Sequence, residues 1–319
     1  MSARRMQGFT LVELMVAMVL GLVVIGGVVS VFLTNQQVYR ANKALSDVQD
    51  SSRIAFELMA RDARTVGLTG CGNSSRIANV VNNNTTAANW YVNWTYPVQG
   101  YTASQTDPVA GAGRTANTES LVLLGAEGTG VSVQTDTESS ATITINEAST
   151  NLVTGDFVMI CDPDHAVIAQ LSSVSGTTLK HAKAGTPGNC TLDLSYPTVC
   201  ASSSSYTFSA NALIARLTAV DWYVASNSAG GTSLFRKSLG PGGAVTVNEM
   251  VRDVTGMTLA YHQSGNASFV TADKVTNWPL VDALQVTLTT ISVDRRAGTN
   301  TAPISRTFTS TTTLRNRVS

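Results

Sequence analysis

The chain carries, near its start, one apolar run far longer than any other in the sequence. From Phe9 to Leu33 nearly every residue is hydrophobic, and the exceptions are Thr10, Glu13, Ser30 and three glycines. A helix of this length spans about 37 Å, more than the ~30 Å hydrocarbon core of a bilayer. The run therefore predicts a membrane-spanning helix that carries one carboxylate, and a carboxylate there is costly enough to indicate a function.

After Leu33 the pattern changes from uniformly apolar to amphipathic. Apolar residues recur at three- and four-residue spacing, as on one face of a helix, and charges of both signs occupy the rest. They are Val38, Ala41, Leu45, Val48, Ala55, Leu58, Met59 and Val66. No proline interrupts Phe9–Val66, and Gly67 provides a stop. We expect one continuous helix of about 87 Å whose second half packs one face on a globular domain.

The remainder of the chain predicts β-structure. Short β-branched or apolar segments are separated by Gly, Asn or Asp, which is typical of strands joined by turns. The expected strands are Ser120–Leu124, Val131–Gln134, Ala141–Ile145, Phe157–Cys161, Val167–Val174, Leu213–Val224, Ser233–Lys237, Met257–His262, Ala283–Val293 and Ile304–Leu314, with Glu249–Val254 as a short strand or a turn. The predicted fold class is α+β: a long N-terminal helix packed on a mainly antiparallel, β-rich C-terminal domain.

Residues 68–118 form a stretch rich in Asn, Thr and aromatic residues, with little helical periodicity. Its aromatic side chains are Trp90, Tyr91, Trp94, Tyr96 and Tyr101. Such a cluster either forms a local core under a loop or makes a sugar- or protein-binding surface. We expect the local core, within a structured insertion that contains short strands.

Charge is sparse and balanced. Only 13% of the 319 residues are charged, and 21 basic residues match 21 acidic ones. A chain without excess positive charge has no overall attraction to nucleic acid or anionic lipid. The balance argues against nucleic acid as a partner and suits an exported, β-rich protein.

The four cysteines are Cys71, Cys161, Cys190 and Cys200. An even number behind an export-type N-terminus favours disulfides, and none of the four forms a CxxC pair. Cys190 and Cys200 close a short loop and are the easiest pair to propose, which leaves Cys71 with Cys161. Four cysteines allow three connectivities, and four buried thiols are the alternative.

The sequence contains no recognisable catalytic set. His165, His181 and His262 lie far apart, and no nucleophile elbow, P-loop, zincin motif or dinucleotide fingerprint is present. Asp156, Asp162 and Asp164 lie near His165, but their spacing does not fit a calcium loop and Pro163 marks a turn. We therefore expect no enzyme activity, no small-molecule substrate, no cofactor and no metal.

The N-terminal residues decide between three interpretations. Arg4 and Arg5 precede the apolar run, which keeps that end cytoplasmic by the positive-inside rule. A secretory signal peptide has a shorter apolar core followed by a small-residue cleavage site, and here the small residue Gly8 comes before the run. A plain membrane anchor leaves Glu13 unexplained.

The segment Gly8-Phe9-Thr10-Leu11-Val12-Glu13-Leu14 resembles the class III signal of type IV pilins and their relatives. The resemblance implies cleavage between Gly8 and Phe9 by a prepilin peptidase and methylation of the new amine on Phe9. It also implies that Glu13 helps to dock subunits into a filament. The corresponding division of the chain is a cleaved leader (1–8), a membrane and filament-core helix (9–33), an amphipathic helix (34–67) and a β-rich domain (68–319), whose parts are 68–118, 119–210 and 211–319.

The order of motifs in the last third resembles larger minor pilins of the PilW type, and also J-type pseudopilins of type II secretion. Those motifs are W-Y-V, S-L-F-R, E-M-V-R-D-V-T-G-M and D-A-L-Q-V. Chain length favours the PilW type. The resemblance implies a role in pilus assembly near the tip, with other minor pilins, the major pilin, the inner-membrane assembly platform and a tip adhesin as partners. A pseudopilin and a surface- or DNA-binding pilus component are the alternatives.

Overall fold

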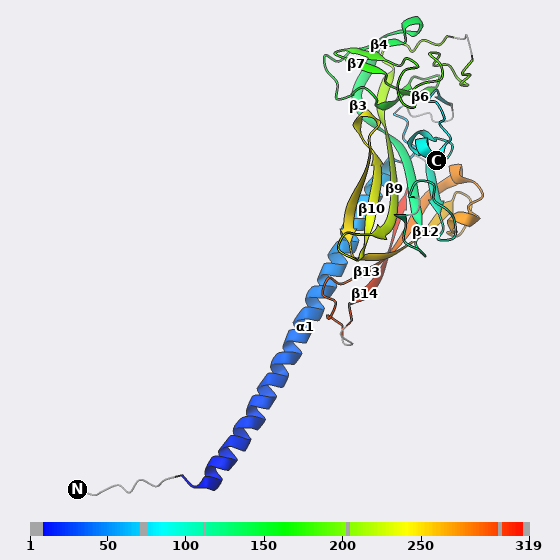
Figure 1. Cartoon of the computed structure of the whole chain (residues 1–319). Helices are drawn as coiled ribbons and strands as arrows, with labels where there is room; N and C mark the ends of the chain where they lie inside the picture. The colour runs from blue at the N-terminus through cyan, green and yellow to red at the C-terminus, as the bar shows by residue number, and fades with distance from the viewer. Residues whose placement is uncertain (1–8, 71–75, 111–112, 202–204, 299–301, 315–319) are drawn as a thin grey trace. The chain divides into compact units, whose positions relative to one another are not determined.

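The computed structural model describes residues 9–70, 76–110, 113–201, 205–298 and 302–314 (Figure 1). The chain divides into two compact units. The smaller comprises residues up to Asp50 and Ile291–Ser305, and the larger comprises Ser51–Thr290 and the residues from Arg306 onward. Helix α1, Leu11–Thr65, contributes residues to both. Its span agrees with the expected continuous helix, because no proline removes a hydrogen bond from its interior.

The smaller unit consists of α1 up to Asp50 and the turn between two strands. The turn is closed by a hydrogen bond from Ser292 N to Ile304 O (2.8 Å) and another from Gly298 N to Ala302 O (2.9 Å). Within this unit Gln37 Nε2 donates to Ala297 O at 3.0 Å. Among the described residues of this unit, the helix thus contacts the turn through a polar side chain of its amphipathic part.

The larger unit contains two sheets. Among the described residues the first has eleven strands: β1 (Ile77–Asn79), β2 (Val98–Tyr101), β3 (Ser120–Thr137), β4 (Thr142–Ile145), β5 (Phe157–Cys161), β6 (Ala166–Gln170), β7 (Ser173–Ser175), β8 (Thr178–Lys180), β9 (Leu213–Ser226), β10 (Thr232–Leu239) and β11 (Val245–Arg252). The main order is β1-β6-β5-β9-β3-β4-β8-β7, with β10 joined to β9, β11 to β10 and β2 to β3. Figure 1 shows β3, β9 and β10 side by side.

The second sheet has the order β12 (Val254–Gln263), β13 (Val281–Ile291) and β14 (Ser305–Thr313). Short 3₁₀ helices lie in the connections: η1 (Ala87–Val92), η3 (Glu138–Ser140), η4 (Pro241–Gly243), η5 (Ala272–Lys274) and η6 (Trp278–Leu280). The pairing of β1 with β6 is parallel, and the other pairings with a resolved register are antiparallel. The expected α+β fold, a long helix with a mainly antiparallel β-rich domain, is confirmed.

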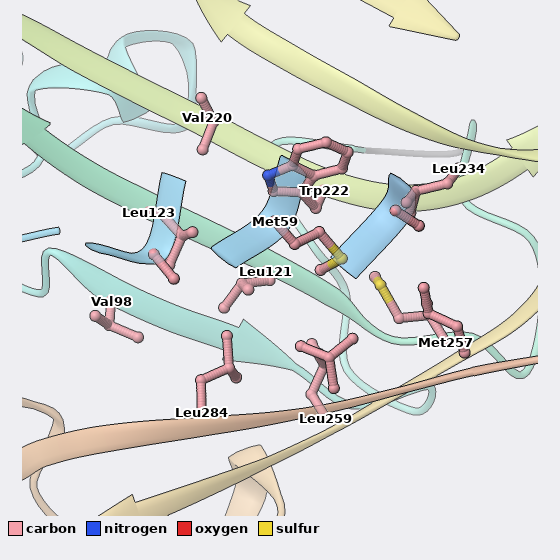
Figure 2. Packing of buried hydrophobic residues seen from close by; sticks show 14 of the residues in the cluster. Met59, Val98, Leu121, Leu123, Val220, Trp222, Leu234, Met257, Leu259 and Leu284 are labelled. Carbon is pink, nitrogen blue, oxygen red and sulfur yellow. The ribbon is translucent and has the colours of Figure 1, made fainter. Parts of the chain in front are cut away.

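The core of the larger unit lies between the last turns of α1 and both sheets. Met59 of α1 is buried among Leu121 of β3, Trp222 of β9 and Met257 of β12 (Figure 2). Leu121 and Trp222 are direct cross-strand partners, so their side chains stand on the same face of the sheet. This face is the one that meets the apolar stripe of the helix.

The opposite face of β3 and β9 is covered by the aromatic stretch. Trp90 and Tyr91 of η1 are buried there with Val122 and Leu124 of β3. The local-core interpretation is thus confirmed for these two rings. Tyr96, in contrast, remains 40% exposed.

The prediction divides three parts of the chain into strands differently from the structure, and most of the other expected strands differ from it in their end residues. The segments Ser120–Leu124 and Val131–Gln134 are one strand, β3, because the glycine-rich residues between them form a bulge against β9 instead of a turn. The segment Val167–Val174 is two strands, β6 and β7. The segment Glu249–Val254 begins earlier, as β11, and ends where Asp253 adopts a left-handed conformation (φ 60°) that turns the chain into β12.

Candidate functional site

The N-terminal end of α1 is closed by a reciprocal pair of side chains. Glu13 Oε2 accepts hydrogen bonds from Thr10 N (3.0 Å) and Thr10 Oγ1 (3.1 Å), and Thr10 Oγ1 accepts one from Glu13 N (3.3 Å). Residues of type Thr-x-x-Glu in this arrangement form a capping box, which satisfies amide groups that have no partner in the first helical turn. Glu13 therefore stabilises its own helix, a role that the sequence motif contains and that our sequence interpretation missed.

The site around Glu13 is apolar and open. Phe9 is 89% exposed and the side chains from Leu11 to Leu33 are exposed on all faces of the helix. An 18-residue window of α1 has a mean hydropathy of 2.8, so by length and composition this one helix among the described residues qualifies as a membrane span. Gly8 lies outside the described residues.

The cysteines are accounted for in part. Cys190 and Cys200 form a disulfide with an S–S distance of 2.01 Å and a Cα–Cα distance of 5.2 Å, as the short loop predicted. Cys161 is buried at the end of β5. Its expected partner, Cys71, lies outside the described residues, so the pairing of Cys71 with Cys161 stays a prediction.

The acidic residues near His165 are engaged by protein groups. Asp156 accepts from Arg216 Nε (3.2 Å) and from Gly242 N (2.6 Å). Its carboxylate therefore already accepts from a backbone amide of the loop at residues 240–243. This loop forms a 3₁₀ turn at Pro241–Gly243 and so offers no α-helix N-terminus that could bind a phosphate.

The turn after β5 is held by two further carboxylates. Asp162 Oδ1 accepts from the backbone amides of Asp164 (2.9 Å) and His165 (3.3 Å). Asp164 pairs with His165 Nδ1 at 3.0 Å and with Arg76 at 2.9 Å. The hydrogen bond from His165, helped by Arg76, lowers the pKa of Asp164. Each of these acids thus has a structural role in fixing the turn.

A partly buried polar junction attaches the last turns of α1 to the first sheet. Trp222 Nε1 donates to Asp62 Oδ2 at 2.9 Å, while Arg236 Nε donates to Oδ2 at 2.8 Å and Nη2 to Oδ1 at 3.2 Å. The side chains of Asp62 and Arg236 are only 17% and 27% exposed. Charge-assisted hydrogen bonds are stronger than neutral ones, and a bidentate pair of arginine and carboxylate adds geometric specificity. The junction fixes the helix rotation on the sheet.

The end of α1 also approaches β3 at backbone distance. Gly67 N donates to Leu124 O at 2.9 Å. A Cβ atom at position 125 would lie 2.2 Å from Thr65 O, so only Gly125 permits this approach. Sequence reasoning missed both contacts, because each joins residues more than 50 positions apart.

Comparison with known proteins concerns only the N-terminal region. A family model described as the prokaryotic N-terminal methylation motif matches residues 3–29. No curated protein matches the chain. The motif and the apolar helix behind it support a type IV pilin-like prepilin that is processed by a prepilin peptidase, anchored in a membrane and placed in a pilus-assembly context. They suggest a structural role for the protein.

Proposed function

We propose that this chain is a minor pilin of the PilW type, which takes part in initiation and assembly of the type IV pilus at or near its tip and so supports twitching motility and adhesion. One observation carries the proposal. Glu13 is the only charged side chain between Arg5 and Arg40, and it stands on an exposed apolar helix. Such a group calls for a cationic partner when the helix enters an apolar assembly.

Processing would create that partner. Cleavage between Gly8 and Phe9 releases an amine on Phe9, and methylation preserves its positive charge. At 4 Å and an effective dielectric constant of 20, two unit charges attract by about 4 kcal/mol. A subunit whose Phe9 amine meets the Glu13 of a neighbour gains a defined register in addition to apolar contact.

The capping box is compatible with this pairing. Its hydrogen bonds from Thr10 go to Glu13 Oε2, and Oε1 accepts none from the described residues. An ionised carboxylate has about four acceptor sites on its two oxygens. Glu13 therefore keeps acceptor capacity for an incoming amine while it caps its own helix.

The membrane orientation follows from the basic leader. By the positive-inside rule, Arg4 and Arg5 favour a cytoplasmic leader, and the β-rich unit would then lie in the periplasm before assembly. The protein would wait in the inner membrane and then move into the filament. Its partners would be other minor pilins, the major pilin, the inner-membrane assembly platform and a tip adhesin.

Size supports a position near the tip. The larger unit comprises Ser51–Thr290 and the residues from Arg306 onward. Part of its size comes from the insertion 68–118, which contains the strands β1 and β2 and the helix η1. Bulk of this kind repeated at every position would crowd a helical lattice. A deletion strain separates the pilus role from that of a J-type pseudopilin: we expect loss of surface pili and twitching with type II secretion intact, and the opposite result rejects the pilus role.

The pairing is tested with Glu13→Gln. We expect normal insertion into the membrane and strongly reduced incorporation into sheared pili, measured by immunoblotting of membrane and pilus fractions. The matched control is Glu57→Gln, the same substitution at an exposed position of the same helix, which should incorporate normally.

A second variant separates pairing from capping. Thr10→Ala removes the capping hydroxyl and leaves the carboxylate of Glu13 available. Incorporation of Thr10→Ala close to the parent level, with loss in Glu13→Gln, supports the pairing. Parent-level incorporation of Glu13→Gln contradicts it, and equal loss in both variants assigns Glu13 to helix capping alone.

A further inference from the structure

A cavity of about 290 Å³ lies in the larger unit, outside the surfaces used in the proposed assembly role. It is lined by Val122 and Leu124 of β3, by residues of η1 and β2, and by the loop that contains Val109. The volume is close to the lower end of the ~300–1,000 Å³ typical of small-molecule sites, most of which are lined by apolar and aromatic groups with a few polar ones.

Buried and partly buried hydrogen bonds hold the segments that line the cavity. Val109 N donates to Asp107 Oδ1 at 2.7 Å, and Val109 O accepts from Lys237 Nζ at 2.8 Å. Asn79 Nδ2 donates to Val92 O, at the end of η1, at 2.7 Å. A ligand would therefore enter a preorganised site, which lowers the entropy cost of binding.

Aromatic rings form three parts of the wall. They belong to Trp90, Tyr96 and Tyr101. Burial raises the pKa of Tyr101, and the nearby charge of Asp107 raises it further, so the phenol remains a neutral donor. Tyr96 is the most exposed ring of the three and is open to a ligand. Rings of this kind combine a broad apolar face with a polar tip.

Thr86 and Asn93 of the lining are engaged within the protein, since Thr86 Oγ1 donates to Asn83 O at 2.9 Å and Asn93 Oδ1 accepts from Thr95 N at 3.3 Å. Two other polar side chains of the lining are left for a ligand. The side chains of Gln99 and Tyr96 have no hydrogen-bond partner among the described residues. Side chains alternate along β2: Val98 and Gly100 are buried on one face, so Gln99 and Tyr101 share the other. A half-buried amide with no protein partner offers two donors and an acceptor to a ligand.

The lack of charged side chains in the cavity lining indicates the class of ligand. None of the lining residues in the described part of the chain is Asp, Glu, Lys, Arg or His. The site therefore lacks a counter-ion for a phosphate, a carboxylate or a metal ion. A sugar ring has an apolar C–H face that fits an aromatic side chain and hydroxyl groups that both donate to and accept from an amide. We infer that this cavity binds a neutral saccharide, such as the terminal sugar of a surface glycan.

Binding is measured on the purified full-length chain in lauryldimethylamine oxide, a detergent without a sugar headgroup. The probes are D-glucose, D-galactose and N-acetyl-D-glucosamine, with the anionic sugar N-acetylneuraminic acid for comparison. Saturation-transfer difference NMR should show transfer from the protein to at least one neutral sugar and not to the anionic one. This measurement does not depend on incorporation into pili. Saccharide binding and the proposed assembly role can therefore be rejected independently of each other.

Variants locate the site. Tyr96→Ala and Gln99→Leu should each weaken binding about tenfold or more, corresponding to a loss of at least 1.4 kcal/mol. The matched control Tyr39→Ala removes an exposed tyrosine (71%) from the smaller unit and should bind like the parent. Thermal unfolding followed by tryptophan fluorescence checks each fold, and Gln99→Leu carries the test if Tyr96→Ala does not fold.

The inference is overturned by any of three results. They are no transfer to any of the neutral sugars, transfer that persists at parent strength in both cavity variants, and equal transfer to N-acetylneuraminic acid. Loss of binding in Tyr39→Ala would equally place the sugar elsewhere on the chain.

Discussion

In residues 11–33 helix α1 exposes apolar side chains on every face, whereas in residues 51–65 the same helix buries one face against two sheets. Two methionines illustrate the contrast: Met18 is 59% exposed and Met59 is 2% exposed. The helix is continuous through both regions, so helix propensity does not distinguish them. What differs is the surroundings of the apolar side chains: residues 11–33 suit a lipid bilayer, whereas residues 51–65 pack against protein.

The contrast shows where specificity resides in each region. Apolar side chains in a bilayer gain little from meeting other helices, because lipid tails are equally apolar. Under the proposed function, Glu13 is the group that distinguishes one arrangement of the first region from another. In the second region specificity is distributed over shape, since interiors are close-packed and small volume changes are felt. The same substitution should therefore change the free energy of unfolding in the second region and leave it unchanged in the first.

The largest expected difference is between Met59→Ala and Met18→Ala. Met59→Ala should lower the free energy of unfolding of the larger unit by about 2–5 kcal/mol, because it removes a buried side chain and leaves a cavity among Trp222 and its neighbours. Met18→Ala should leave that free energy unchanged. Denaturant unfolding of the detergent-solubilised chain, followed by tryptophan fluorescence, measures both.

The probe is selective for the larger unit. All four tryptophans, at positions 90, 94, 222 and 278, belong to it. If Met18→Ala shifts the transition as much as Met59→Ala does, the two regions unfold as one and the contrast drawn above is lost.

The first region could be predicted from sequence because its signals are local. An apolar run, a glycine and a glutamate at fixed spacing define it within a few turns of helix. The same holds for Phe157–Cys161, which is a strand with the bounds expected from its continuous apolar pattern. Even here one local signal was missed, since Thr10 and Glu13 have the spacing of a capping box.

The second region could be predicted only in outline. The helical stripe indicated that one face is buried, but not that Asp62, on the same helix, would bind Trp222 and Arg236. Those residues lie more than 150 positions away along the chain. The parallel pairing of β1 with β6 is equally non-local. Spacing rules describe neighbours along the chain, and tertiary pairing depends on which faces meet.

A smaller difference is expected between Asp62→Asn and Glu57→Gln, two charge-neutralising substitutions on the same helix. Asp62→Asn leaves the partly buried guanidinium of Arg236 without its counter-ion and should cost about 1–3 kcal/mol. Glu57→Gln removes only an exposed pair with Arg53 and should cost less than about 0.5 kcal/mol. Chemical denaturation at pH 7 compares the two.

The result sharpens the contrast within the second region. Equal, small effects would mean that the junction of Asp62, Trp222 and Arg236 is as well solvated as the surface pair, and that apolar packing alone holds the helix. A larger effect at Asp62 shows that the buried face of the helix is fixed by polar groups as well.

The smallest expected effect concerns the pH dependence of stability. In this dependence the segment Phe9–Leu33 has only Glu13 as a titrating side chain, whereas the larger unit has buried titrating groups. The ring of His181 is fully buried, and neither ring nitrogen has a hydrogen-bond partner among the described residues. Burial lowers the pKa of His181 to about 4. Since the unfolded pKa is about 6.5, the unfolded chain binds the extra proton between these values, and stability falls as pH falls through that window.

His181→Leu should remove this dependence. Between pH 7 and pH 5 the parent should lose about 1–2 kcal/mol more than the variant, measured as the difference between their unfolding free energies at each pH. The difference isolates His181 because the other titrating groups are common to both chains. If the unfolding free energies of parent and variant change with pH in parallel, the ring of His181 is hydrated in the folded protein and its pKa is not lowered by burial.

His262 provides the opposite sign within the same unit. Its Nδ1 lies 2.6 Å from Asp282 Oδ1 and its Nε2 lies 2.8 Å from Asn266 O, so both ring nitrogens face acceptors. The hydrogen bond to Asp282, followed by that to Asn266, raises the pKa of His262. Its contribution is fully present below about pH 6.5 and is lost as pH rises through the raised pKa. His262→Gln should therefore lower stability at pH 6 and have little effect at pH 9, where the parent has already lost the charged ring; an effect of equal size at both pH values would assign His262 a role in packing instead of charge.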